Sequence, residues 1–105
     1  MPLYTVIRQF PGATRTDLDA AAFRSLTCLR YHDGLAWIRS YWNAAAEQLS
    51  CIYEAQNAEQ IRFHARRADI PCDEIYEVEE VLPSEFAFDT EAVLSASGNG
   101  LTDSQ

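Results

Sequence analysis

The order of strand and helix patterns along the chain is the feature that most constrains its fold. Two segments repeat apolar residues at helical spacing, and segments rich in β-branched and aromatic residues flank each of them. Strands are expected at residues 3–10, 35–43, 49–55 and 75–82, and helices at 16–32 and between residues 57 and 71. This β-α-β-β-α-β order predicts an α+β fold, the ferredoxin-like plait, in which two helices cover one face of a four-stranded antiparallel sheet.

Each expected helix has a start signal and an apolar face. Thr16 with Asp19 three residues later forms a capping-box pattern, and Asn57 with Gln60 predicts the cap of the second helix. The faces expected to pack on the sheet are Leu18, Ala22, Leu26 and Leu29 in the first helix and Ile61, His64, Ala65 and Ala68 in the second. The spacing therefore predicts two amphipathic helices.

The length of the chain bounds the number of domains. Its 105 residues suffice for one hydrophobic core. We assign residues 1–82 to one ferredoxin-like domain and residues 83–105 to a C-terminal arm and tail. Phe86 and Phe88 are expected to pack as an extended arm, and the Ser, Gly and Asn residues from Ser95 onward are typical of a flexible tail.

Charge and cysteine content exclude several classes of protein. A formal net charge of -8 repels a phosphate backbone, so no nucleic-acid partner is expected. No segment is long and apolar enough to span a membrane, and residues 1–7 lack the basic start of a signal peptide. Three widely spaced cysteines, Cys28, Cys51 and Cys72, argue against a disulfide framework. We therefore expect a soluble protein of a reducing, cytoplasmic compartment.

The strands carry apolar side chains on both faces. Along residues 35–43, Trp37 and Tyr41 alternate with Ala36, Ile38 and Trp42. Two helices cover only one face of a sheet, so an apolar second face needs another cover. A second copy of the chain is the simplest cover, which predicts a homodimer. An aromatic face in contact with water is the alternative.

His64 is the first candidate for chemistry, because it falls on the apolar face of the second helix. Glu54 lies where the preceding strand turns into this helix and is expected to approach His64. A carboxylate and an imidazole in an apolar site can bind a divalent metal or act as a general acid–base pair. Cys51 adds a thiol, but on a regular strand it points away from Glu54 and joins the site only through a bulge or a partner chain. A hydrogen-bonded core histidine and a small buried cysteine are the structural alternatives.

A second cluster is expected on the strand at residues 35–43. Alternation places Trp37, Arg39 and Tyr41 on one face. These side chains form either a pocket for an aromatic or anionic small molecule or part of the dimer contact, and both interpretations stay open. The other histidine of the chain, His32, is expected at an exposed helix end.

Several short runs of residues resemble the DUF4242 family. They are Leu3-Tyr4 with Arg8 and Phe10, Ser40-Tyr41, Cys51-Ile52-Tyr53-Glu54-Ala55, Ile61-Arg62 with His64-Ala65 and Ala68, and Ile70-Pro71 with Ile75. The resemblance extends over residues 3–81 and implies a ferredoxin-like fold, a dimeric α+β barrel and nickel binding. It marks Cys51, Glu54 and His64 as candidate metal ligands and implies no reaction.

Metal binding is the function that the resemblance and the residues together favour. The expected protein is a homodimer that binds a divalent transition metal, nickel first, at a site centred on His64 and Glu54. One alternative is a small-molecule enzyme of the dimeric-barrel type, such as an isomerase, a cyclase or a cofactor-free oxygenase. The other alternative is a non-catalytic dimeric interaction module.

Overall fold

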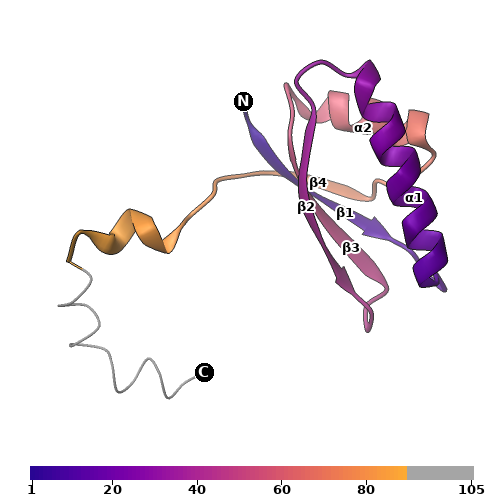
Figure 1. Ribbon diagram of the computed structural model, residues 1–105, viewed down its shortest axis with the longest axis horizontal. Helices are drawn as coiled ribbons and strands as arrows, with labels where there is room; N and C mark the ends of the chain where they lie inside the picture. The colour runs from indigo at the N-terminus through magenta and orange to yellow at the C-terminus, as the bar shows by residue number, and fades with distance from the viewer. Residues whose placement is uncertain (90–105) are drawn as a thin grey trace.

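The computed structural model describes residues 1–89, which form a four-stranded sheet and two α-helices with short 3₁₀ segments (Figure 1). In chain order the elements are β1 (Leu3–Gln9), α1 (Arg15–Cys28), η1 (Leu29–Tyr31), β2 (Ala36–Asn43), β3 (Gln48–Glu54), α2 (Ala58–Ala68), β4 (Glu74–Val78) and η2 (Pro83–Asp89). All pairings in the sheet are antiparallel, and the strand order is β2-β3-β1-β4. The predicted α+β fold of the ferredoxin-like type is confirmed.

Both α-helices lie on one face of the sheet, and the core lies between that face and the helices (Figure 1). In β1, Tyr4, Val6 and Arg8 are buried, and the residues between them are half-buried on the other face. Tyr4 pairs with Tyr53 and Val6 with Cys51 across β1 and β3. Because side chains of directly paired residues share a face, these two pairs form the floor beneath the helices.

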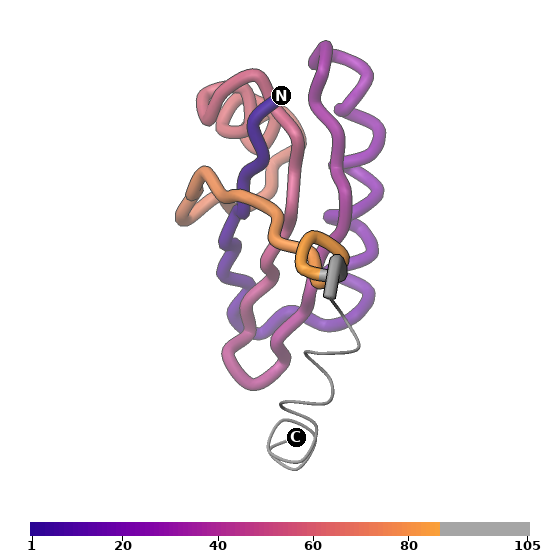
Figure 2. The backbone as a smooth tube through the Cα atoms, turned by 90° about the vertical axis from the view of Figure 1, so that its left-hand side faces the viewer, coloured from indigo at the N-terminus to yellow at the C-terminus, as the bar shows by residue number. Residues whose placement is uncertain are grey.

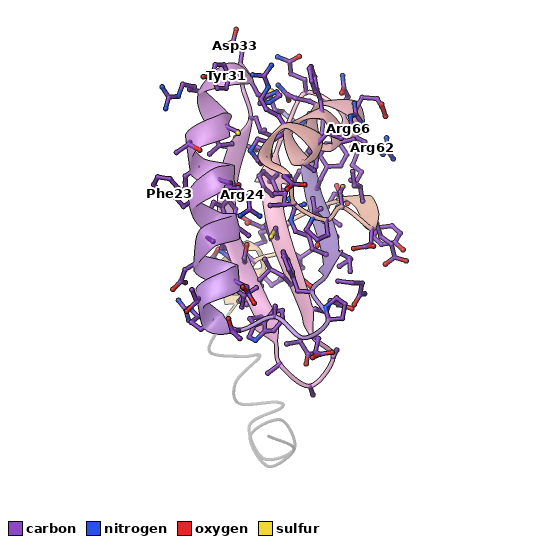
Figure 3. The ribbon with its side chains drawn as sticks, turned by 90° about the vertical axis from the view of Figure 1, so that its right-hand side faces the viewer. Phe23, Arg24, Tyr31, Asp33, Arg62 and Arg66 are labelled. Carbon is purple, nitrogen blue, oxygen red and sulfur yellow. The ribbon has the colours of Figure 1, made fainter. Side chains whose placement is uncertain are left out.

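The second helix is built as the sequence predicts. The Asn57 side chain accepts a hydrogen bond from the Gln60 backbone N–H at 2.9 Å. The buried residues of α2 are Ile61, His64, Ala65 and Ala68. At its other end Arg24 of α1 donates to the backbone oxygens of Ala68 at 2.8 Å and Asp69 at 3.1 Å (Figure 3). These bonds satisfy carbonyls that a helix end leaves free, and they tie the two helices together.

The cap of the first helix lies two residues before the predicted one. Thr14 is the cap: its Oγ1 accepts from the Asp17 backbone N–H at 3.2 Å, and Asp17 accepts from the Thr14 backbone N–H at 2.9 Å. The prediction of Thr16 as the cap is therefore wrong. Asp19, its expected partner, instead accepts from Arg15 at 2.8 Å on the exposed helix surface.

The apolar face of the first helix is also turned relative to the prediction. Its buried residues are the small Ala21 and Ser25, whereas Leu26 is 56% exposed. Phe23 is exposed as well and points away from the domain (Figure 3). These two small side chains face the sheet, so the large apolar residues of α1 do not define its inner face.

A β-bulge interrupts β2. Trp37 pairs with Tyr53 and Arg39 pairs with Ile52, so Ile38 is an extra residue on this strand. The extra residue puts Trp37 on the helix-covered face and Arg39 on the opposite one. Regular pairing resumes after the bulge and carries Tyr41 to the same open face as Arg39. The prediction that Trp37, Arg39 and Tyr41 share one face is therefore wrong.

Both α-helices leave the opposite face of the sheet uncovered. In Figure 2, which views this face, η2 crosses in front of it, and Figure 1 shows that η2 stands away from the sheet. The strand register places on it a row of apolar and aromatic side chains from all four strands. Its larger apolar members are Leu3, Ile7, Tyr41, Ile52, Tyr76 and Val78. We call this surface the open face.

After β4 the chain leads away from the sheet into η2 (Figure 1). The Glu85 backbone N–H donates to the Leu82 carbonyl, and the Leu82 N–H donates to the Glu85 carboxylate, both at 2.9 Å. These bonds form 3₁₀ turns where an extended arm was expected. The flexible tail predicted from Ser95 lies outside the described residues, and the domain boundary after residue 82 stays a prediction. Within residues 1–89 no helix combines the length and the apolar character needed to cross a membrane.

Candidate functional site

His64 is fully buried where α2 packs against α1. Its Nε2 lies 3.0 Å from the backbone oxygen of Ser25. A carbonyl oxygen only accepts, so Nε2 carries the proton of the neutral imidazole and Nδ1 has a free lone pair. This Nδ1 is buried and has no hydrogen-bond partner among the described residues. Buried polar atoms without a partner are rare, which makes Nδ1 a candidate ligand atom.

His32 lies against His64, and the prediction that it occupies an exposed helix end is wrong. The residue is 8% exposed, and its ring centre is 5.4 Å from the ring centres of both His64 and Phe63. The Nε2 atom of His32 is likewise buried without a partner in the described part of the chain. Sequence reasoning missed this pair because the contact joins the turn after one helix to the middle of another.

Burial is the main electrostatic influence on both imidazoles. Desolvation lowers the pKa of His64. The Ser25 carbonyl opposes this change, whereas the charge that His32 carries when protonated and the charge of Arg8 add to it. Desolvation also lowers the pKa of His32, and the charge of Arg67 lowers it further. Both rings are therefore neutral at pH 7, which is the form of histidine that binds a metal.

Glu54 and Cys51 lie apart from the two histidines. Glu54 is exposed on the open face, whereas the adjacent Tyr53 lies beneath the helices with its ring centre 6.0 Å from that of His64. The chain therefore does not bring the Glu54 carboxylate to His64. Cys51 is 2% exposed and lies on the helix-covered face. Across residues 1–89, no three His, Cys, Asp or Glu side chains gather closely enough to hold a metal ion.

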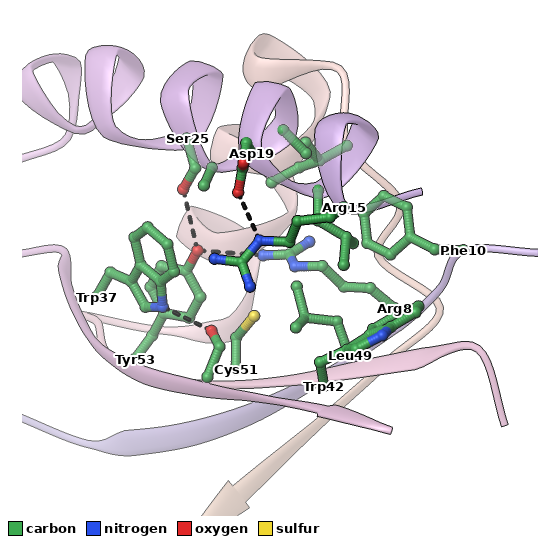
Figure 4. A pocket seen from close by; sticks show the side chains of 15 residues that line it. Arg8, Phe10, Arg15, Asp19, Ser25, Trp37, Trp42, Leu49, Cys51 and Tyr53 are labelled. Carbon is green, nitrogen blue, oxygen red and sulfur yellow. Dashed lines mark hydrogen bonds and ion pairs between the residues drawn. The ribbon is translucent and has the colours of Figure 1, made fainter. Parts of the chain in front are cut away.

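A cavity of about 250 Å³ lies between α1 and the sheet, and Cys51 is one of its lining residues (Figure 4). Arg8 of β1 also lines it and is 2% exposed. One terminal nitrogen of Arg8 donates to the Pro71 carbonyl, and the other donates to the Tyr53 hydroxyl at 3.3 Å. The Tyr53 hydroxyl is in turn 3.2 Å from the hydroxyl of Ser25. Sequence reasoning missed Arg8 as a site residue, although strand alternation aligns it with buried neighbours on β1.

The predicted cluster on β2 divides between two surfaces. Trp37 lines the cavity and stacks on Tyr53, with ring centres 6.4 Å apart and planes at 17°. Trp42 lines the same cavity. Arg39 and Tyr41 are exposed on the open face. The bulge in β2 thus places Trp37 at the cavity and the other two residues on the open face.

Comparison with protein families matches residues 4–78 to a family described as nickel responsive protein SCO4226-like. The chain is also similar to the crystal structure of SCO4226 from Streptomyces coelicolor A3(2), with a TM-score of 0.68 and 22% sequence identity. That similarity covers 76% of this chain and 99% of the other, and it supports the fold. A search of curated proteins found no match. The DUF4242 label is not confirmed, but the nickel association that it implied agrees with the description of the matched family.

Proposed function

Because the chain belongs to the family of SCO4226-like nickel responsive proteins, we propose that it binds a divalent transition metal, nickel first, through His64 and His32. The observation that carries the proposal is the pair of buried nitrogen atoms, Nδ1 of His64 and Nε2 of His32, that lack a partner in the described chain. His64 keeps the central place that the sequence predicted for it. His32 takes the place of Glu54 beside it.

The spacing of the two rings suits a shared ion. Metal–nitrogen bonds of about 2.1 Å place each ring centre about 3.2 Å from the metal. Two imidazoles on one ion then have ring centres about 4.5 to 5.2 Å apart, for bond angles between a right angle and a tetrahedral one. The observed separation of 5.4 Å lies close to this range. The proposal requires Nδ1 of His64 and Nε2 of His32 to turn toward one shared ion.

The surroundings of His64 also favour a ligand role. Metal-binding histidines usually donate their second ring N–H to a carboxylate or a backbone carbonyl, which fixes the tautomer and the ring orientation. The Ser25 carbonyl accepts this bond from His64. Two imidazoles alone leave most of the coordination sphere without a protein ligand, so we expect moderate affinity and ready exchange of the metal.

Nickel titration of the metal-free, untagged protein tests this proposal. We expect saturable binding by isothermal titration calorimetry, and a loss of more than about tenfold in affinity in His64→Gln and in His32→Gln. Glutamine keeps a donor near the Ser25 carbonyl of α1 and removes the imidazole lone pair. The circular dichroism spectrum of each variant establishes that it is folded.

Glu54→Gln and Cys51→Ala are the matched controls, because the family resemblance marks both residues as ligands. If both controls bind nickel with wild-type affinity and the two histidine variants do not, the result supports metal binding by His64 and His32. Loss in Glu54→Gln with retention in His32→Gln would restore the site centred on His64 and Glu54. No nickel binding in the wild-type protein would refute metal binding by either set of residues.

We further propose that the protein is a homodimer that buries its open face. The face carries Ile52, Tyr76 and Val78, and the described chain offers no element to cover it. Single exposed apolar residues are ordinary, but a contiguous patch across a whole sheet is typical of an interaction surface. A two-fold contact of open face on open face covers both copies with the same residues.

Light scattering coupled to size-exclusion chromatography measures the expected dimer. The wild-type protein should have twice the 11.9 kDa mass of the chain. Ile52→Lys and Tyr41→Lys place a charge on the open face and should yield monomers. Phe23→Lys, on the exposed side of α1, should remain dimeric. A monomeric wild-type protein, or open-face variants that stay dimeric, would contradict the proposal.

A further inference from the structure

The cavity beneath α1 contains a buried positive charge. Arg8 keeps its charge at any physiological pH, and its side chain is 2% exposed. Among residues 1–89 no carboxylate lies within ion-pair distance of it. It donates to the Pro71 carbonyl and the Tyr53 hydroxyl, which are both dipoles, and the Cys51 side chain lies beside it. Burial of an unpaired cation is costly, and most such charges in proteins have a counter-ion.

Tyr53 does not supply that counter-ion. Burial raises the pKa of its phenol above the usual range, although the charge of Arg8 opposes the shift. The phenol is therefore neutral at pH 7, and its hydroxyl serves as a relay between Arg8 and the Ser25 hydroxyl. The charge of Arg8 remains available to a ligand.

The rim of the cavity adds no excess negative charge. The lining includes Arg15 and Asp19, which form an exposed ion pair with each other at 2.8 Å (Figure 4). Together with Arg8, the lining residues have one net positive charge. The whole chain has a formal net charge of -8, so this cavity is a local positive site on an acidic protein.

The walls of the cavity are flat and apolar. Trp37 stacks on Tyr53, and Trp42 lies edge-on to Phe10 with ring centres 6.5 Å apart. Leu18, Leu49 and Ile70 add further apolar side chains to a lining that also includes Ser40 and Cys51. The volume of about 250 Å³ is below the roughly 300 to 1,000 Å³ of pockets for drug-sized ligands, so the site suits a small molecule.

We propose that this cavity binds a small aromatic carboxylate, with its carboxylate on Arg8 and its ring against Trp37 and Tyr53. A planar guanidinium matches a carboxylate through paired hydrogen bonds, and the aromatic walls match a flat apolar body. Inorganic phosphate would satisfy the charge but would leave the apolar walls without a partner. The proposal involves none of the proposed metal ligands and holds whether or not nickel binds.

Benzoate is the probe, and benzamide is its neutral isostere. The only two tryptophans of the chain, Trp37 and Trp42, both line the cavity, so intrinsic fluorescence reports directly on occupancy. With a chelator present, we expect a saturable fluorescence change with benzoate and binding weaker by about tenfold or more with benzamide, since benzamide lacks the charge that Arg8 pairs with.

Two variants locate the site. Arg8→Met should abolish the preference for benzoate over benzamide. Arg8 is buried, so its loss can unfold the protein, and Ala22→Phe serves as the second variant. Ala22 is a partly exposed residue of α1 that lines the cavity, so a phenylalanine there fills the cavity and leaves Arg8 in place. A folded Ala22→Phe protein should lose benzoate binding. Equal affinities for benzoate and benzamide would overturn the proposal. So would displacement of benzoate by inorganic phosphate at an equal affinity, or wild-type affinity for benzoate in Ala22→Phe.

Discussion

Replacing Ile61 with alanine is expected to lower the free energy of unfolding by about 2 to 5 kcal/mol. The Ile61 side chain has no exposed surface and packs in the core with Val6 and Tyr53. Truncation removes apolar contacts and leaves a cavity that the packed sheet beneath α2 cannot close. Urea denaturation followed by far-ultraviolet circular dichroism measures the change, at equal protein concentration because a dimer would be stabilised by mass action.

Leu26→Ala is the matched control for this prediction. Leu26 occupies the other helix but is 56% exposed, so its truncation should cost about 0.5 kcal/mol or less. Both residues belong to apolar faces that helical spacing predicts, and only the structure distinguishes them. A loss at Leu26 as large as that at Ile61 would mean that α1 packs with the face that its spacing suggested.

The difference between the two helices shows where sequence reasoning succeeds. In α2 the apolar positions stand out against charged neighbours such as Arg62 and Arg66, which lie on its outer side (Figure 3), so one face is unambiguous. In α1 apolar residues occur around most of the circumference. The side that is buried carries the small residues Ala21 and Ser25. That choice depends on tertiary packing, which a local pattern does not contain.

The strands show a similar division. Alternation places Tyr4, Val6 and Arg8 on one face of β1, and the structure agrees. On β2 the same rule fails at Ile38, because one extra residue exchanges the faces of everything beyond it. Nothing in the residue types around Ile38 distinguishes a bulge from a regular strand. The predicted cluster on β2 was divided for this reason.

The candidate site depends on contacts between elements that are distant in the sequence. His64 was predicted correctly as a buried helix residue, but its neighbour His32 and the orienting Ser25 carbonyl belong to the first helix and its end. Residues near each other in the chain, such as Glu54 and His64, are natural candidates for a pair. The pleat of β3 instead directs Glu54 to the open face.

Acidification of the metal-free protein is expected to destabilise the fold already near pH 6. Burial lowers the pKa of His64 and of His32 below the unfolded value of about 6.5. Between the folded and the unfolded pKa the unfolded chain binds more protons, so stability falls as the pH falls. At a pH above the unfolded pKa, the stability that comes from burying the two histidines in their neutral form is fully present. In that pH range the free energy of unfolding can change by about 1.4 kcal/mol per pH unit for each histidine. His64 should contribute most to this change, because it has no exposed surface.

The carboxylate of Asp17 affects the stability in a separate, lower range of pH. Hydrogen bonds from the Thr14 backbone and side chain lower the pKa of Asp17, so the stability from this cap is lost only at lower pH, below about 4. Urea unfolding at about pH 7.5, 6.5 and 5.5, with a chelator present, isolates the histidine window. His64→Gln should flatten the slope there, and Asp17→Asn should leave it unchanged. Protonation of either ring brings a positive charge into a buried contact, and the charges of Arg8 and Arg67 oppose it further. A wild-type stability that stays constant from about pH 7.5 to 5.5 would therefore contradict the burial of two neutral imidazoles.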